Sequence, residues 1–317
     1  MSDNASQGRH IVVAVDGTKQ NARGIELKET TNVFRATRCI ENSNSSTGGI
    51  LYIPGLGVEG NAYENLKGLF WGSGIDRQIC RGYEKICREY RSSEDTLILI
   101  GYSRGAFAIR CLVDLITKFG VLVDTWKAGK LGNEVPDHIR RESVNRGNII
   151  CILWDTVGAV GDKLLRLIDS GTEGGGFNYH ALSLHERRKK FLPTVMRFRQ
   201  PVLLKDSEQC WFVGYHGDVG GGRKKNALAN LALAWALGKL RQHLEPNWAP
   251  LEGIENEPGD VWKIERRTGR GTGKRYATPR TFALGSRTLD IVWAGLVHSG
   301  RSRRDTSGKE RLDPVVR

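Results

Sequence analysis

At 317 residues, with 39% hydrophobic and 26% charged residues, the chain can bury a sizeable core and has the charge content of an ordinary globular protein. No run of 18 apolar residues occurs, which argues against a membrane-spanning helix, and residues 1–8 lack the basic-then-apolar pattern of a signal peptide. The formal net charge is +13. Because neither a signal-peptide pattern nor a long apolar run is found, we expect a cytoplasmic protein, or one exported by a route that needs no signal peptide.

Five short apolar runs, rich in β-branched and aromatic residues, predict strands that are buried on both faces of a sheet. In chain order they are residues 11–15, 50–53, 97–100, 149–154 and 211–215. Between them, helical spacing or a nearly continuous apolar surface predicts helices at residues 75–90, 106–116 and 226–244. Strands that alternate with helices predict a doubly wound α/β fold with a mostly parallel sheet flanked by helices.

We expect one domain over residues 1–317, with a basic C-terminal extension at residues 261–317. This extension holds 14 Lys or Arg and 5 Asp or Glu. Such a charge excess suits peripheral contact with anionic lipid headgroups, and a solvated basic surface is the alternative. Nucleic acid is not expected, because no pattern of interleaved aromatic and basic residues accompanies the charge. The six cysteines show no CxxC spacing, so we expect buried thiols and no metal.

The third predicted strand runs into Gly-Tyr-Ser-Arg-Gly at residues 101–105 and then into a helix. This is a G-x-S-x-G elbow in the strand–turn–helix context that the motif requires. Ser103 is the expected nucleophile, because the flanking glycines permit a tight turn that exposes its hydroxyl. The backbone N–H of Arg104, at the start of the helix, is an expected oxyanion donor. A serine that only caps the helix is the alternative.

The expected acid and base also follow strands. Asp155 ends the fourth strand, and its place after the nucleophile fits the Ser, Asp, His order of α/β-hydrolases. His216 directly follows the fifth strand and is the expected general base, with His298 as a weaker competitor. Asp218 is the alternative triad acid, ranked second because a partner two residues from His216 needs an unusual loop conformation. Either aspartate could instead cap a turn.

The first predicted strand ends in Asp16, Gly17 and Thr18. This loop should lie beside the elbow, so a second oxyanion donor is expected from the backbone N–H of Gly17 or Thr18. Asp16 would hydrogen-bond the elbow or its own loop. An Asp-Gly turn without a chemical role is the alternative.

Taken together, these motifs resemble the catalytic domain of the type VI secretion phospholipase effectors, a family with bacterial and fungal members. The segments that carry the resemblance are residues 15–18, 101–107, 154–161, 181–193 and 211–222. The resemblance implies an α/β-hydrolase fold and a phospholipid esterase, and it supports Ser103, Asp155 and His216 as a catalytic triad. The chain departs from the family at residues 19–21 (Lys-Gln-Asn), where an aromatic residue is frequent.

We therefore expect a serine esterase or lipase that needs no cofactor and hydrolyses an acyl ester, of a phospholipid or another lipid. Residues 66–72 (Leu-Lys-Gly-Leu-Phe-Trp-Gly) hold bulky apolar groups that could face a membrane or a pocket, or pack as a buried loop. Two alternatives stand beside this expectation: a hydrolase of a small soluble ester or thioester, and a non-catalytic protein that binds through its basic tail. Turnover of long-chain or phospholipid esters distinguishes the first hypothesis from both.

Overall fold

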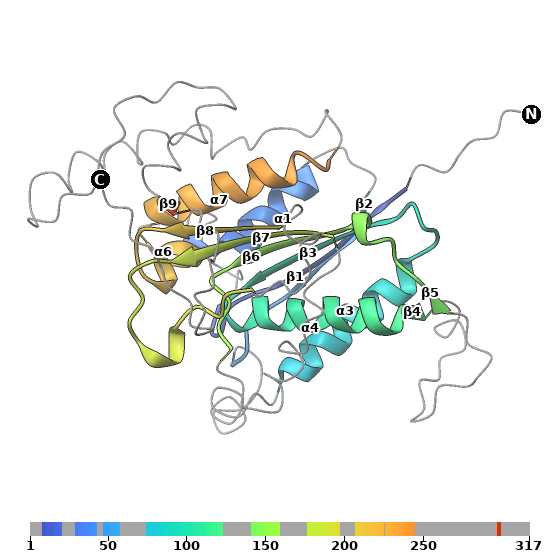
Figure 1. Ribbon diagram of the computed structural model, residues 1–317, viewed down its shortest axis with the longest axis horizontal. Helices are drawn as coiled ribbons and strands as arrows, with labels where there is room; N and C mark the ends of the chain where they lie inside the picture. The colour runs from blue at the N-terminus through green and yellow to red at the C-terminus, as the bar shows by residue number, and fades with distance from the viewer. Residues whose placement is uncertain are drawn as a thin grey trace, which may run out of the picture.

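A central sheet with helices on both faces forms the body of the molecule (Figure 1). The computed structural model describes residues 8–20, 29–42, 47–57, 74–122, 141–158, 176–196, 207–224, 226–244 and 297–298. The strands of the sheet are β1 (His10–Val15), β2 (Thr47–Ile53), β3 (Thr96–Tyr102), β6 (Ile149–Trp154), β7 (Phe177–Ser183), β8 (Ser207–Phe212) and β9 (Val297–His298). Their order is β2-β1-β3-β6-β7-β8-β9, and only the β8–β9 pair among them is antiparallel.

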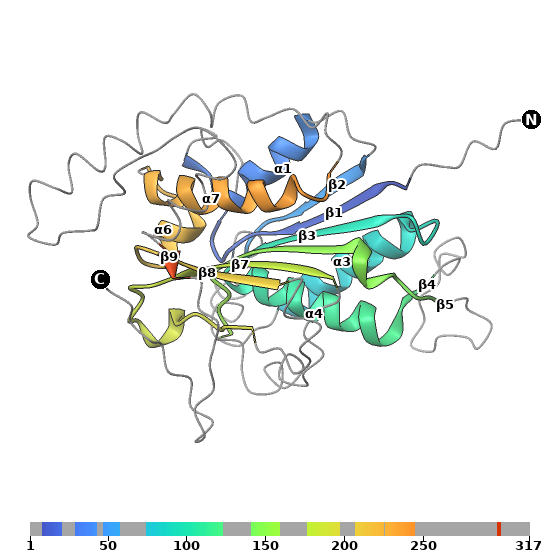
Figure 2. The ribbon, with the colours of Figure 1, turned by 45° about the horizontal axis from the view of Figure 1, so that its top comes forward.

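Helices cover the sheet on two sides (Figures 1 and 2). The described helices and remaining short elements are α1 (Asn32–Asn42), α3 (Ile75–Glu89), α4 (Arg104–Phe119), β4 (Val121–Leu122), β5 (Arg141–Glu142), η3 (Arg146–Asn148), η4 (Lys189–Phe191), α6 (His216–Gly220) and α7 (Ala227–Leu240). Helices α3 and α4 lie on one face, and α1 and α7 lie on the other (Figure 1). This arrangement confirms the predicted α/β-hydrolase-like fold.

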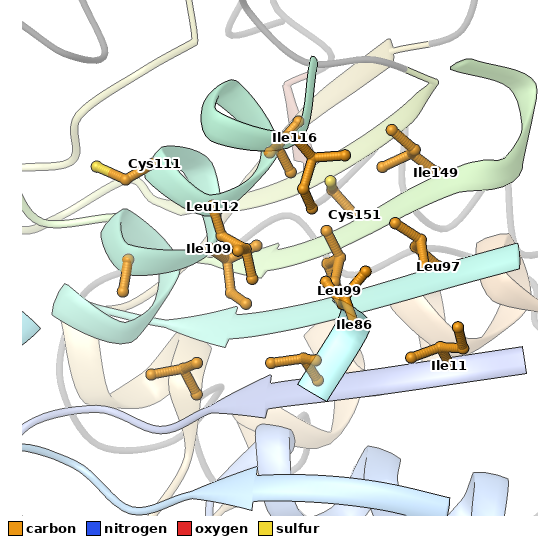
Figure 3. Packing of buried hydrophobic residues seen from close by; sticks show 14 of the residues in the cluster. Ile11, Ile86, Leu97, Leu99, Ile109, Cys111, Leu112, Ile116, Ile149 and Cys151 are labelled. Carbon is orange, nitrogen blue, oxygen red and sulfur yellow. The ribbon is translucent and has the colours of Figure 1, made fainter. Parts of the chain in front are cut away.

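Alternate residues of the central strands build two separate cores. In β3, Leu97 and Leu99 pack toward α3 and α4, whereas Ile98 and Ile100 pack toward α1 and α7. Figure 3 shows the first of these clusters. Because both sets of side chains are buried, the strand reads as an unbroken apolar run rather than as an alternating one. This double burial makes the central strands visible in the sequence.

The structure differs from the sequence-based prediction at several places, of which three bear on the body of the fold. Strand β7 was not predicted, because its sequence (Phe-Asn-Tyr-His-Ala-Leu-Ser) is not an apolar run, although six of its seven residues are buried. Helix α1 was also missed. Strand β8 lies at Ser207–Phe212, so the predicted strand at residues 211–215 ends three residues later than the observed one. Five of the six cysteines are buried free thiols as expected, and Cys80 is exposed.

The carboxyl ends of the parallel strands all meet at one edge, where open α/β sheets bind their ligands. Ser103 follows β3, Asp155 follows β6 and His216 follows β8 at this edge. The apolar segment at residues 66–72 lies outside the described residues. So does the basic extension at residues 261–317, apart from the two residues of β9. No helix in the described part of the chain is both long and apolar enough to cross a membrane.

Candidate active site

Ser103 occupies a strained turn between β3 and α4. Its φ of 59° and ψ of −124° lie in a region that L-residues rarely adopt, at a cost of about 1–3 kcal/mol. The turn needs glycine on both sides. A Cβ on Gly101 would lie 2.6 Å from the Ala106 Cα, and one on Gly105 would lie 2.3 Å from the Val15 carbonyl oxygen. The two glycines of the G-x-S-x-G pattern are therefore required by steric contacts in this structure.

Strand β6 holds the strained turn in place. The Ser103 backbone N–H donates to the Trp154 carbonyl at 3.0 Å, and the Val157 N–H donates to the Ser103 carbonyl at 3.1 Å. These two bonds tie the elbow to the residues on either side of Asp155, whose own φ is 43°. These bonds therefore fix the position of the elbow relative to Asp155.

A chain of hydrogen bonds joins Ser103, His216 and Asp155. The His216 Nε2 lies 2.8 Å from the Ser103 Oγ, and its Nδ1 lies 2.6 Å from the Asp155 Oδ2. An ionised carboxylate only accepts hydrogen bonds, so Nδ1 carries the hydrogen and Nε2 offers its lone pair to the Ser103 hydroxyl. All three residues are buried. This arrangement can remove a proton from the serine hydroxyl.

Ser183, the last residue of β7, completes the surroundings of the Asp155 carboxylate. Its backbone N–H donates to Oδ1 at 2.7 Å, and its hydroxyl donates to Oδ2 at 2.8 Å. With the bond from His216, the carboxylate accepts three hydrogen bonds although its side chain is fully buried. These donors offset the cost of burying the charge. Ser183 lies within the segment at residues 181–193 that carries the family resemblance, but nothing in the sequence indicated this role.

Two aromatic rings contact the His216 imidazole. The Tyr102 ring stacks on it with centroids 4.8 Å apart, and the Phe191 ring lies 5.3 Å away. Burial and the nearby carboxylate of Asp155 raise the pKa of Tyr102 well above its usual range. Its hydroxyl therefore stays protonated and donates to the His216 carbonyl at 3.3 Å. A Cβ on Gly220 would lie 2.0 Å from the Tyr102 ring, which makes glycine necessary there.

Glu186 fastens the backbone of His216 to the segment that follows β7. Its Oε2 accepts the His216 N–H at 3.2 Å and the Arg188 Nη2 at 2.6 Å, while Oε1 accepts the Arg188 Nε at 2.9 Å. The Arg188 guanidinium holds the pKa of Glu186 at about 2, against the opposing effect of burial. Arg188 also lies over the Phe191 ring, 4.2 Å from its centroid. Glu186 is a second site residue that the sequence did not reveal.

Asp218 lies two residues beyond His216 but uses its carboxylate elsewhere. Its Oδ2 accepts the Tyr215 backbone N–H at 2.9 Å, and its Oδ1 accepts the Arg223 Nη1 at 3.2 Å. It therefore caps the first turn of α6. The carboxylate that contacts the His216 ring is that of Asp155.

Asp16 organises the loop after β1. Its Oδ2 accepts hydroxyl hydrogens from Thr31 at 2.7 Å and Tyr52 at 2.6 Å, and its Oδ1 accepts the Gly17 N–H at 2.6 Å. Burial raises the pKa of Asp16 to about 6, although these hydrogen bonds lower it. The loop reaches the elbow, because a Cβ on Gly17 would lie 3.4 Å from the Ser103 Cβ.

The Gly17 N–H already donates to Asp16, so in this conformation it is not directed at a substrate oxygen. The N–H groups of Lys19 and Gln20 donate to the carbonyls of Leu56 and Gly17. Thr18 differs, because its Oγ1 is buried and has no hydrogen-bond partner. Arg104 is the first residue of α4, which places its N–H at the helix N-terminus. Of the three residues expected to supply oxyanion donors, Gly17 is therefore the one whose N–H is already bound within its own loop.

Two other expectations concern histidine and metal. His298 lies in β9, opposite Trp211, and belongs to the edge of the sheet rather than to the elbow. Within the residues that the structure describes, no three His, Cys, Asp or Glu side chains gather as metal ligands would.

Comparison with known proteins gives a consistent match at the family level. The family model described as "T6SS, Phospholipase effector Tle1-like, catalytic domain" matches residues 9–133 and 132–239. An uncharacterised protein of Saccharomyces cerevisiae, YEL023C, is 25% identical over 228 residues, which are 60% of this chain and 33% of that protein.

Solved structures match parts of the chain at low sequence identity and with TM-scores below 0.5. An uncharacterised protein from Pseudomonas aeruginosa has a TM-score of 0.49 and 17% identity, covering 79% of this chain and 48% of the other. The Tle1 effector bound to the VgrG spike of the type 6 secretion system has a TM-score of 0.40 and 16% identity, covering 68% and 51%. The propionate-bound esterase of Thermogutta terrifontis has a TM-score of 0.34 and 16% identity, covering 77% and 86%. The chain thus spans a third of the yeast protein and about half of the first two structures.

Proposed function

This chain belongs to the family of type VI secretion phospholipase effector Tle1-like catalytic domains, and from that premise we propose that it is a serine hydrolase of lipid acyl esters. One observation carries the proposal: the strained Ser103 lies 2.8 Å from the His216 Nε2, whose Nδ1 lies 2.6 Å from a buried Asp155. A serine that merely capped α4 would need neither the strain nor the buried partners.

In the proposed reaction, the Ser103 Oγ attacks the acyl carbonyl carbon while the His216 Nε2 takes the hydroxyl proton. The tetrahedral intermediate collapses to an acyl-enzyme, and His216 returns the proton to the departing alcohol. Water, deprotonated by His216, then releases the carboxylic acid and restores the serine. Asp155 keeps the hydrogen on Nδ1 and stabilises the imidazolium in each half of the cycle.

We propose the backbone N–H groups of Arg104 and Thr18 as the oxyanion donors, with the Thr18 hydroxyl as an additional one. The Thr18 hydroxyl supports this assignment because it is buried without a partner, and an unpaired buried hydroxyl is costly unless a ligand completes it. Asp16 would act indirectly, by binding the Gly17 N–H and so fixing the direction of the loop. Each such donor contributes about 10²–10³-fold to kcat in comparable sites.

The experiment compares the chain with its Ser103→Ala variant on p-nitrophenyl esters of short and long acyl chains and on a phospholipid. Ser103→Ala should lower kcat by about 10⁴-fold or more without changing the thermal unfolding midpoint appreciably. Substantial ester hydrolysis by the folded variant would contradict the proposal. Turnover of short esters alone would indicate a small soluble ester or thioester, and no turnover at all would favour a binding protein.

A further inference from the structure

Two segments lie side by side around His216 at the carboxyl edge of the sheet: residues 184–192, after β7, and residues 215–224, after β8. The Leu184 N–H donates to the Phe212 carbonyl at 2.9 Å, and the His185 N–H donates to the Gly214 carbonyl at 3.0 Å. Figures 1 and 2 place η4 and α6, which belong to these segments, at the same end of the molecule. We call the exposed side chains of these two segments the His216 rim.

The rim holds most of the large exposed apolar side chains in the described part of the chain. Within the described residues, four large hydrophobic side chains are exposed, and three of them belong to the rim: Leu184 at 45%, Leu192 at 47% and Tyr215 at 49%. The fourth, Phe119, ends α4 at the opposite end of the sheet. Each of these three apolar residues is next in sequence to a residue of the site, because Leu184 follows Ser183, Leu192 follows Phe191 and Tyr215 precedes His216. Exposed apolar side chains gathered on segments that border a site are typical of a contact surface.

The rest of the rim is basic. Its other exposed side chains are Arg187, Arg188, Lys189, Lys190, Arg223 and Lys224. Neither of the two acidic residues in these segments is exposed, so their carboxylates do not repel an anionic partner. Glu186 is buried against Arg188, and Asp218 is partly buried against Arg223. The rim therefore presents apolar and cationic groups together, without an exposed carboxylate.

We propose that the His216 rim docks on the surface of an anionic phospholipid bilayer and so places the Ser103 site against its substrate. This inference rests on the proposed function and names how that site meets its lipid. Aliphatic and tyrosine side chains enter the interfacial region of a bilayer, while Lys and Arg meet the anionic headgroups. A single-stranded nucleic acid fits less well, because stacking platforms use several aromatic rings and the exposed rim has one. The proposed docking surface is thus built from residues 184–192 and 215–224.

The experiment measures binding of the full chain to vesicles in a Ser103→Ala background, so that hydrolysis does not alter the membrane. Vesicles of phosphatidylcholine alone are compared with vesicles that also contain phosphatidylglycerol, at low and at high salt. Replacing Arg187, Lys189 and Lys224 by Gln should weaken binding to the anionic vesicles about 100-fold at low salt. Added salt should weaken binding of the parent protein in the same direction.

The matched control replaces Arg88, Arg91 and Arg146 by Gln. These arginines are also exposed, but they lie near the amino ends of β3 and β6, at the far end of the sheet. The control removes the same charge, so it should weaken binding less than about tenfold if docking is oriented. Equal losses in the two triple variants would mean that only net charge matters, and would overturn the proposal.

A second pair of variants tests the apolar part of the rim and does not depend on the first. Leu184→Ser with Leu192→Ser should weaken vesicle binding about tenfold or more, because two exposed aliphatic groups no longer enter the bilayer. Phe119→Ser is the control and should leave binding nearly unchanged. Equal effects would overturn the proposal, as would tighter binding of the rim to single-stranded DNA than to anionic vesicles.

Soluble short-chain ester turnover, measured on protein with Ser103 intact, separates this inference from the proposed function. Rim-dependent vesicle binding by a protein that turns over neither the short-chain ester nor a phospholipid would refute the hydrolase and leave the proposed docking surface unaffected. Ester turnover by a protein that does not bind vesicles would refute only the proposed docking surface.

Discussion

Replacing Asp155 by Asn tests which carboxylate serves His216. Asp155 accepts the Ser183 N–H on Oδ1, and it accepts the Ser183 hydroxyl and the His216 Nδ1–H on Oδ2. The Ser183 N–H belongs to the backbone and cannot turn, so the single oxygen of Asn should stay at the Oδ1 position. The Asn amide then points its N–H groups at His216.

The expected consequence is a change of tautomer. His216 can accept from the amide only if its hydrogen moves from Nδ1 to Nε2, and the ring then no longer accepts the Ser103 proton. The resulting loss in kcat is about 10⁴-fold, or roughly 5.5 kcal/mol of transition-state stabilisation. Steady-state hydrolysis of a soluble p-nitrophenyl ester near neutral pH measures it, with thermal unfolding as the check on folding.

Asp218→Asn is the matched comparison. It removes the same charge next to the same helix, but its carboxylate binds Tyr215 and Arg223 rather than the His216 ring. Its ion pair with Arg223 is half exposed, so the substitution should cost less than about tenfold in kcat. A larger loss from Asp218→Asn than from Asp155→Asn would refute the reasoning and move the acid role to Asp218.

Two further predictions concern stability. Glu186→Gln should lower the free energy of unfolding by about 2 kcal/mol at neutral pH. Because Arg188 lowers the pKa of Glu186 from 4.5 to about 2, this difference from wild type should shrink as the pH falls through that range. Glu84→Gln, in the exposed pair with Arg88, should cost less than about 1 kcal/mol and is the control. The raised pKa of Asp16, about 6 against 3.8, means that the protonated carboxyl favours the fold at low pH and that this benefit is lost as pH rises past 6. Asp16→Asn should therefore gain about 3 kcal/mol relative to wild type between about pH 4 and about pH 8, by denaturant unfolding, and a pH-independent difference would contradict this.

Local sequence patterns were sufficient to predict the central strands, the elbow and three residues of the site. The central strands were visible because burial on both faces makes them continuous apolar runs, as in residues 97–100. The elbow was visible because a tight turn with a positive φ at Ser103 leaves no room for a Cβ on Gly101 or Gly105. The order of Asp155 and His216 after that elbow named the residues that the fold brings into one hydrogen-bonded chain.

Only the tertiary structure decided how that chain is supported. Ser183 and Glu186 act on partners 28 and 30 residues away, and neither distance leaves a periodic trace in the sequence. Strand β7 was missed because its polar side chains find partners within the fold, as when Asn178 donates to Ser207. The direction of the Gly17 N–H likewise depends on the orientation of the Asp16 carboxylate. Steric requirements and apolar burial depend on neighbouring residues, so local sequence patterns can predict them. Hydrogen bonds between distant strands form only once the sheet has formed, so such patterns do not predict them.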